Sequence, residues 1–182
     1  MQVISVTSGK GGVGKTNVVC NLAVELGRRG DKVLLIDCDL GLANVDIVMG
    51  VKPQATLYQL LTGEAKLNEV LVEAAPNVTI LPASSGIRDM TRLNDEQYLS
   101  LIAELESIDQ AFDVVLLDTG AGIGDNVLYF NTAAQSVLVV STPEPTSITD
   151  AYAIMKVLST DYQVRKFDLL VNRVRSRKDA LK

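Results

Sequence analysis

The sequence predicts a doubly wound α/β fold, in which a mainly parallel sheet has helices on both faces. Short apolar runs alternate with longer amphipathic runs along the chain, and this alternation favours parallel strands joined by right-handed crossovers. The 182 residues are 47% hydrophobic but only 4% aromatic, so we expect an aliphatic core, as in sheets that are covered on both faces. No linker, repeat or low-complexity tract interrupts the pattern, which favours a single domain over residues 1–182.

Six apolar runs are expected to be strands, because each has five to seven residues rich in aliphatic or β-branched side chains. In chain order they are Val3–Thr7, Lys32–Asp37, Asn77–Pro82, Phe112–Asp118, Ser136–Thr142 and Phe167–Asn172.

The segments between these runs are expected to be helices. The first begins after a glycine-rich loop and is followed by Gly30, a typical stop signal. A later one carries Tyr98, Leu99, Ile102 and Leu105 at helical spacing. The expected helices are Thr16–Arg29, Thr56–Leu61, Leu67–Glu73, Asp95–Ser107, Asp125–Ala134 and Ile148–Ser159.

Composition excludes several classes of function. The net charge of −5 argues against a protein that binds nucleic acid over its whole surface. The chain has no histidine, so histidine bases and histidine metal sites are excluded. Its two cysteines, Cys20 and Cys38, form neither a disulfide framework nor a zinc motif. This cysteine usage favours a reducing, cytoplasmic compartment. No signal peptide and no apolar run near 18 residues is visible.

The segment "GKGGVGKT", from Gly9 to Thr16, matches the phosphate-loop pattern G-x-x-x-x-G-K-[ST]. It lies between an expected strand and an expected helix, which is the context that this motif requires. Backbone N–H groups of such a loop face phosphate oxygens, and the helix N-terminus adds partial positive charge. We expect Lys15 to reach the β and γ phosphates and the Thr16 hydroxyl to bind Mg²⁺.

A second lysine, Lys10, lies five residues before Lys15, at a position where ordinary phosphate loops need no particular residue. With it, Lys10–Thr16 reads "KGGVGKT", letter for letter the deviant loop of the MinD/ParA family of ATPases, which this chain resembles. The resemblance implies that Lys10 crosses to the partner subunit and binds its phosphates, so that ATP lies between two monomers. It implies catalytic roles for Lys10, Lys15 and Asp39, with ATP/ADP and Mg²⁺ as cofactors. The alternative reading of Lys10 is a solvated loop lysine.

The resemblance also assigns nucleotide contacts beyond the two lysines. Asn172 ends the last expected strand, and its amide can donate to and accept from an adenine edge. The alternative for Asn172 is a strand-end turn residue. The implied nucleotide-binding residues are Gly9, Lys10, Gly11, Gly12, Val13, Gly14, Lys15, Thr16, Asn17, Asn172 and Arg173.

Carboxylates follow two of the expected strands. Asp37 and Asp39 come at the end of one, and Asp118 ends the other after four apolar residues. Such carboxylates can position an attacking water or hold the water shell of magnesium. The resemblance makes Asp39 the switch I aspartate that orients the water, and it gives a metal site of Thr16, Asp39 and Asp118. Asp37 is expected to support the loop or the outer metal shell. The alternative for both Asp37 and Asp39 is a helix cap or a solvated turn residue.

Finer motifs resemble the flagellar number regulators called FlhG or FleN. These motifs are "DLGLANVDIVMG" and "DTGAGIGDN". The resemblance implies a slow, partner-stimulated ATPase whose ATP-dependent homodimer regulates flagellar number or placement. Its expected partner is a flagellar signal-recognition-type GTPase or another flagellar regulator. A MinD-like division-site regulator is the alternative. A ParA-type partitioning ATPase is less favoured, because the "DxDPQ" stretch is missing and the net charge is negative.

The family usually continues beyond the adenine strand into further C-terminal helices, which residues 1–182 are expected to lack. One of those helices is amphipathic and binds membranes. Peripheral association with the inner membrane is therefore expected only for a form that carries this helix, and no specific nucleic acid is expected as a partner.

Overall fold

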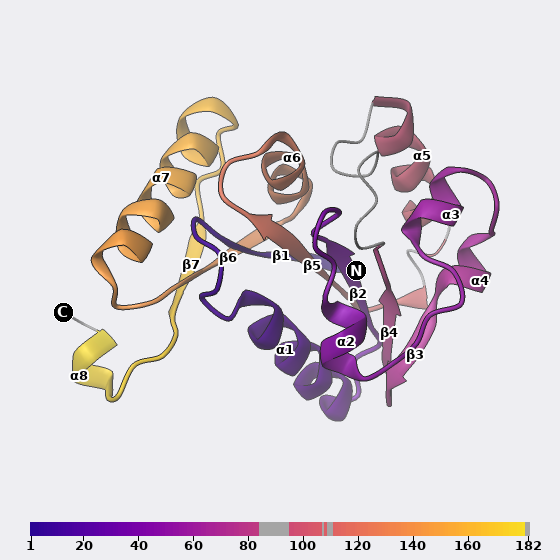
Figure 1. The fold of residues 1–182 in the computed structure, drawn as a ribbon, viewed down its shortest axis with the longest axis horizontal. Coiled ribbons are helices and arrows are strands. Elements are labelled where there is room, and N and C mark those ends of the chain that lie inside the picture. Colours follow the sequence, from indigo (N-terminus) through magenta and orange to yellow (C-terminus); the bar gives the residue numbers. More distant parts are fainter. Residues whose placement is uncertain (84–94, 107, 109–110, 181–182) are drawn as a thin grey trace.

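The computed structural model describes residues 1–83, 95–106, 108 and 111–180. Its strands are β1 (Gln2–Ser8), β2 (Val33–Cys38), β3 (Val72–Ala75), β4 (Val78–Leu81), β5 (Val114–Ala121), β6 (Ser136–Ser141) and β7 (Phe167–Val171). Together they form one sheet in the order β3-β4-β2-β5-β1-β6-β7 (Figure 1). All neighbouring strands pair in parallel except β3, which is antiparallel to β4. The mainly parallel sheet that the sequence predicted is confirmed.

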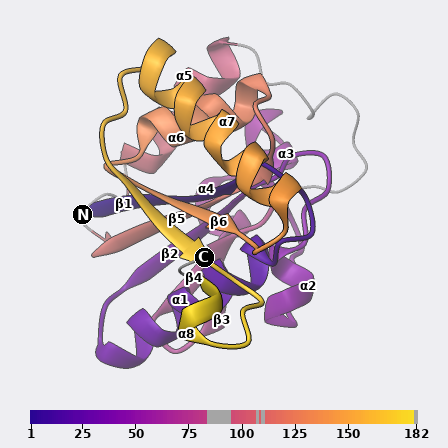
Figure 2. The ribbon, with the colours of Figure 1, turned by 90° about the vertical axis from the view of Figure 1, so that its left-hand side faces the viewer.

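Helices cover both faces of this sheet, as the doubly wound fold requires. The helices are α1 (Lys15–Arg29), α2 (Val45–Met49), α3 (Leu57–Leu61), α4 (Leu67–Val70), α5 (Asp95–Glu106), α6 (Asp125–Ala133), α7 (Pro145–Asp161) and α8 (Arg177–Ala180). Figure 2 shows α5, α6 and α7 on one face and α1 and α2 on the other. None of the helices in the described part of the chain has the length and apolar character that a membrane crossing requires.

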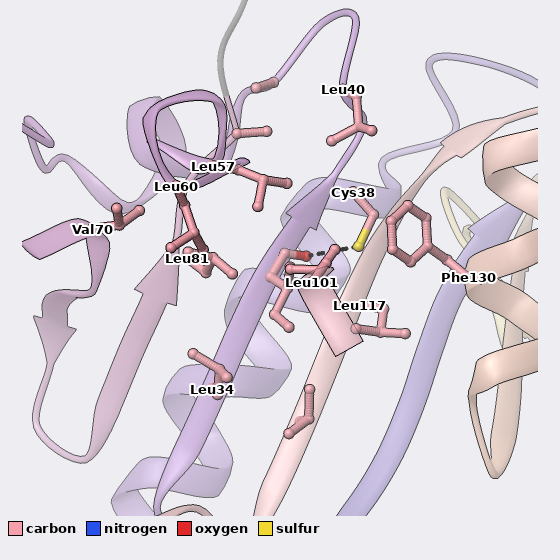
Figure 3. Close-up of a cluster of buried hydrophobic side chains, with 14 of the residues drawn as sticks. Leu34, Cys38, Leu40, Leu57, Leu60, Val70, Leu81, Leu101, Leu117 and Phe130 are labelled. Atoms are coloured by element: carbon pink, nitrogen blue, oxygen red, sulfur yellow. Dashed lines mark hydrogen bonds between the residues drawn. The ribbon is translucent and has the colours of Figure 1, made fainter. Parts of the chain in front are cut away.

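Alternate side chains of β2 pack in two separate aliphatic clusters. Leu34 and Ile36 pack with residues of α3 to α6 (Figure 3), whereas Val33 and Leu35 pack on the opposite face with residues of α1. All four side chains are at most 1% exposed. Burying each stabilises the fold by about 1.5–3 kcal/mol. The apolar character of β2 on both of its faces thus fixes it in the middle of the sheet.

Helix α1 has nearly the expected bounds, because glycines define both of its ends. Gly14 precedes it with φ 93°, and Gly30 follows it with φ 102°. The Gly30 N–H donates to the carbonyls of Gly27 and Leu26, which satisfies backbone groups of the last turn. The helix therefore begins directly at the phosphate loop.

Other bounds were wrong or missing in the sequence prediction. The expected helix Leu67–Glu73 ends at Val70, because the chain next forms β3, an unpredicted edge strand that pairs with β4. The helices α2 and α8 were also missed, since each has only four or five residues and too few turns for a periodic pattern.

Two further differences concern proline and a helix face. Helix α7 begins at Pro145, a turn earlier than the expected Ile148, because proline is tolerated at the first helical position. In α5, Leu101 is buried, whereas Leu99 is 66% exposed, so the predicted apolar spacing did not identify the core-facing residue. Ser107, the predicted end of this helix, lies outside the described residues.

The carboxyl ends of the central strands meet at one edge of the sheet. Asp37 of β2 is the register partner of Asp118 on β5. Val6, near the end of β1, is the register partner of Asp118 on the other side. The parallel sheet therefore brings the phosphate loop and both carboxylate stretches together, as expected at this edge of a doubly wound fold.

Candidate functional site

A cavity of about 860 Å³ opens where the phosphate loop meets the segment after β2 and the segment after β5. Its wall includes most of the residues that the sequence predicted for the site. The predicted residues that line it are Gly11, Gly12, Val13, Gly14, Lys15, Thr16, Asn17, Asp39 and Arg173. Gly9, Lys10, Asn172 and Asp118 do not line it.

Glycine is required at position 14 for two reasons. Its φ of 93° lies in the left-handed region, which side chains rarely adopt. A Cβ added there would also lie 2.5 Å from the Asn172 side-chain nitrogen. The loop can therefore curl tightly into the start of α1, where free N–H groups and the helix dipole favour an anion.

The Lys15 side chain forms a buried ion pair that the sequence did not predict. Its Nζ lies 2.7 Å from Asp118 Oδ1, and the two residues are 8% and 1% exposed. Burial raises the pKa of the Asp118 carboxyl, while Lys15 and a hydrogen bond from Thr16 oppose this shift. Lysine and carboxylate thus neutralise each other at the floor of the site.

Asp37 supports the segment that follows β2. One carboxylate oxygen accepts the N–H of Asp39 at 3.1 Å, and the other accepts those of Asn44 and Val45 at 2.9 and 3.1 Å. The side chain is 1% exposed, and burial raises the pKa of its carboxyl to about 6. Of its two expected roles, loop support is the one that these contacts provide.

Asp39 lies on the cavity wall, in the switch I segment, which we define as residues 39–45. Its Oδ1 accepts the Leu42 N–H at 3.3 Å, which closes a short turn. A Cβ added to Gly120 would lie 3.7 Å from the same Oδ1. Asp39, which is predicted to orient the water, therefore lies next to the segment that follows Asp118.

The donor set fits a magnesium ion held partly by phosphate. Thr16 and Asp39 offer oxygens on the cavity wall, and Asp118 hydrogen-bonds with Thr16 behind them. Within the described residues, no group of three acidic or thiol side chains forms a metal site by itself. Magnesium commonly uses one or two carboxylates together with substrate phosphates and water, so this arrangement suits a nucleotide-bound ion.

Lys10 does not line the cavity of its own chain. Its Nζ lies 3.0 Å from Thr146 Oγ1 and 3.3 Å from Glu144 Oε2, at the start of α7. The two lysines of the loop thus have separate surroundings, one buried on Asp118 and one exposed beside α7.

Asn172 joins the last strand to the phosphate loop. Its side-chain nitrogen donates to the Val13 carbonyl at 2.8 Å, and its side-chain oxygen accepts the Arg173 N–H at 2.9 Å. Arg173, with φ 59°, lines the cavity instead. The role of Asn172 in reading adenine stays a prediction, and its contact with the loop is a function that the sequence did not indicate.

Apolar side chains at the cavity rim were also missed by the sequence prediction. Leu42 and Ile47 are each 72% exposed, and Val48 is 41% exposed. The available signal was an apolar cluster in "DLGLANVDIVMG" with no expected helix or strand to bury it. Exposed apolar groups in such a patch are typical of a surface that another molecule covers.

Several known proteins resemble this chain over most of its length. The AAA domain family matches residues 1–169. The antiactivator FleN of Pseudomonas aeruginosa is 48% identical over 176 residues, which are 97% of this chain and 63% of FleN. The flagellum site-determining protein YlxH of Helicobacter pylori is 42% identical over 156 residues, 86% of this chain and 53% of YlxH. The septum site-determining protein MinD of Pyrococcus horikoshii, complexed with Mg-ADP, is 31% identical. It matches with a TM-score of 0.75 over 98% of this chain and 73% of MinD.

Proposed function

This chain belongs to the AAA domain family, among its MinD/ParA-type ATPases, and from that premise we propose that it is an ATP-hydrolysing switch. In this proposal it dimerises when it binds ATP and regulates the number or placement of flagella. The chain spans 63% of FleN and 53% of YlxH, so the activity and partners of the whole protein are part of the proposal.

One observation carries the proposal, namely the separation of the two loop lysines. Lys15 and Asp39 belong to one cavity, whereas the Lys10 ammonium lies outside it beside α7. A lysine whose ammonium lies outside the cavity of its own chain is available to the nucleotide of a second copy. This supports a dimer in which each subunit contributes Lys10 to the other.

The residues of the chain suit hydrolysis of a nucleoside triphosphate. The Lys15 ammonium exchanges the Asp118 carboxylate for the β and γ phosphates, and the N–H groups of the loop hold the same oxygens. Asp39 orients a water whose oxygen attacks the γ phosphorus, and the bond to the β–γ bridging oxygen breaks to give ADP and phosphate. Thr16 would help to hold Mg²⁺, which would supply neutralisation of the charge on the phosphate oxygens.

Hydrolysis is proposed to be slow until a partner binds. Asp39 sits in switch I, whose support includes hydrogen bonds to Asp37, and a partner can shift such a segment between two arrangements. The proposed partner is a flagellar signal-recognition-type GTPase or another flagellar regulator, because YlxH is named a flagellum site-determining protein and FleN is named an antiactivator.

A division-site role is the second candidate, since the MinD of Pyrococcus horikoshii shares this fold and 31% of its residues. We propose a cytoplasmic location, with peripheral binding to the inner membrane for a form that carries a terminal amphipathic helix. Sedimentation with anionic vesicles, in ATP and in ADP, tests that part, and ATP-dependent pelleting of residues 1–182 would contradict it.

The central test has a biochemical and a cellular arm. Light scattering should show a dimer with a slowly hydrolysed ATP analogue and a monomer with ADP. In the source organism, deletion of the gene should change the number or position of flagella. If deletion instead gives misplaced septa with normal flagella, the division-site function replaces the flagellar one.

A further inference from the structure

The contact between Lys10 and the start of α7 has a specific geometry. The ammonium donates to Thr146 Oγ1 at 3.0 Å and lies 3.3 Å from Glu144 Oε2. The Lys10 and Glu144 side chains are 41% and 60% exposed. The pair is thus accessible to solvent and can open at small cost, unlike the buried pair of Lys15 and Asp118.

The backbone around Lys10 is fixed against the same helix. A Cβ added to Gly9 would lie only 2.1 Å from the Asp150 carbonyl oxygen, so the loop contacts α7 directly at this glycine. The Ser8 hydroxyl donates to the Lys10 carbonyl at 3.0 Å. These contacts hold the base of the Lys10 side chain beside the first turns of α7, within reach of Glu144.

Electrostatics makes Glu144 the essential member of the contact. The N-terminus of a helix carries partial positive charge, which disfavours a cation, and Lys10 lies at the N-terminus of the 17-residue helix α7. Glu144 is the N-cap residue of α7 and supplies the opposing negative charge. Without that charge, the helix end would repel the ammonium.

We propose that Glu144 and Thr146 form a clamp that holds Lys10 within its own subunit while the protein is monomeric. This proposal rests on the proposed function. On dimerisation, the Lys10 ammonium then has to leave Glu144 and Thr146 and contact the phosphates of the partner's nucleotide. Exposed ion pairs of this kind alter an equilibrium by a factor of about 1.5 to 5. Because a symmetric dimer opens two clamps, their removal tightens the dimer about 2- to 25-fold.

The first experiment measures the dimer dissociation constant of the full chain with a slowly hydrolysed ATP analogue, by analytical ultracentrifugation. Glu144→Gln and Thr146→Val should each tighten the dimer relative to wild type. Glu25→Gln is the matched control, because Glu25 forms a similarly exposed pair with Arg29, on α1, and should leave the constant unchanged. Equal or weaker dimerisation of Glu144→Gln than of wild type would overturn the clamp.

The second experiment does not depend on dimerisation. In the ADP state, the rate at which an amine-acylating reagent modifies Lys10 is followed by mass spectrometry. In Glu144→Gln, Lys10 should be acylated several-fold faster than in wild type. Lys52, the control lysine, should be acylated at the same rate in both proteins. An unchanged Lys10 rate contradicts the clamp. If wild type and variants all stay monomeric with the ATP analogue, the proposed function fails, and the acylation rates alone decide whether the clamp exists.

Discussion

Replacement of Lys15 by methionine should destabilise the protein even without nucleotide. The substitution keeps a long apolar stem but leaves the Asp118 carboxylate buried without its cation, 2.7 Å from where Nζ lay. Removing one partner of a buried ion pair typically costs about 3–5 kcal/mol. For a domain of this length, each kcal/mol lowers the melting temperature by about 2–4 °C, so Lys15→Met should melt about 6–20 °C lower.

The assay is thermal and urea unfolding in the absence of nucleotide, with Lys52→Met as the control at an exposed lysine. The double variant Lys15→Met, Asp118→Asn should recover much of the loss, because no buried charge is then left unpaired. pH gives an independent check. Burial raises the pKa of Asp118, and loss of Lys15 raises it further. The penalty of Lys15→Met should therefore be small at acid pH, where the carboxyl is protonated, and grow as the pH rises.

Two results would refute this reasoning. One is a Lys15→Met variant that loses ATP binding but unfolds within about 1 kcal/mol of wild type, well below the cost of a broken buried pair. The other is a double variant that is no more stable than the single one. Either result would mean that Lys15 acts on phosphate alone and does not stabilise the site through Asp118.

Three further substitutions test separate parts of the site. Lys10→Ala should still bind ATP in equilibrium dialysis but should not dimerise with a slowly hydrolysed analogue; normal dimerisation would exclude a cross-subunit role. Asp39→Ala should bind ATP and dimerise but release phosphate at least 10-fold more slowly, because the water is no longer oriented; a normal rate would move that role to another residue. Gly14→Ala should weaken ATP binding at least 10-fold, since its Cβ would meet the Asn172 amide 2.5 Å away and strain the loop; unchanged affinity in a titration would show that the loop can relax.

Local patterns in the sequence were enough to predict the sheet and the phosphate loop. The run that became β2 is apolar at four consecutive positions, because alternate residues face two different helix layers. Gly14, Lys15 and Thr16 lie at fixed spacings on one continuous strand–loop–helix unit. Because these three residues are adjacent in the chain, the local backbone alone fixes their relative positions.

Some features depended on pairing and packing that the local patterns did not reveal. Residues 72 and 73 read as the end of a helix, but they belong to β3 because β4 offers an unpaired edge across a tight turn. Leu42 and Ile47 are apolar in sequence and exposed in structure, since no neighbour in the described part of the chain buries them.

The sequence by itself determined which residues can bind phosphate and which strand ends carry carboxylates, because those properties belong to residue types and short spacings. Only the tertiary structure decided how these groups are paired. Lys15 and Asp118 are 103 positions apart, and Lys10 and Glu144 are 134 apart. The parallel sheet brings their strand ends to one edge, and burial there makes one pair costly to break while exposure leaves the other easy to exchange.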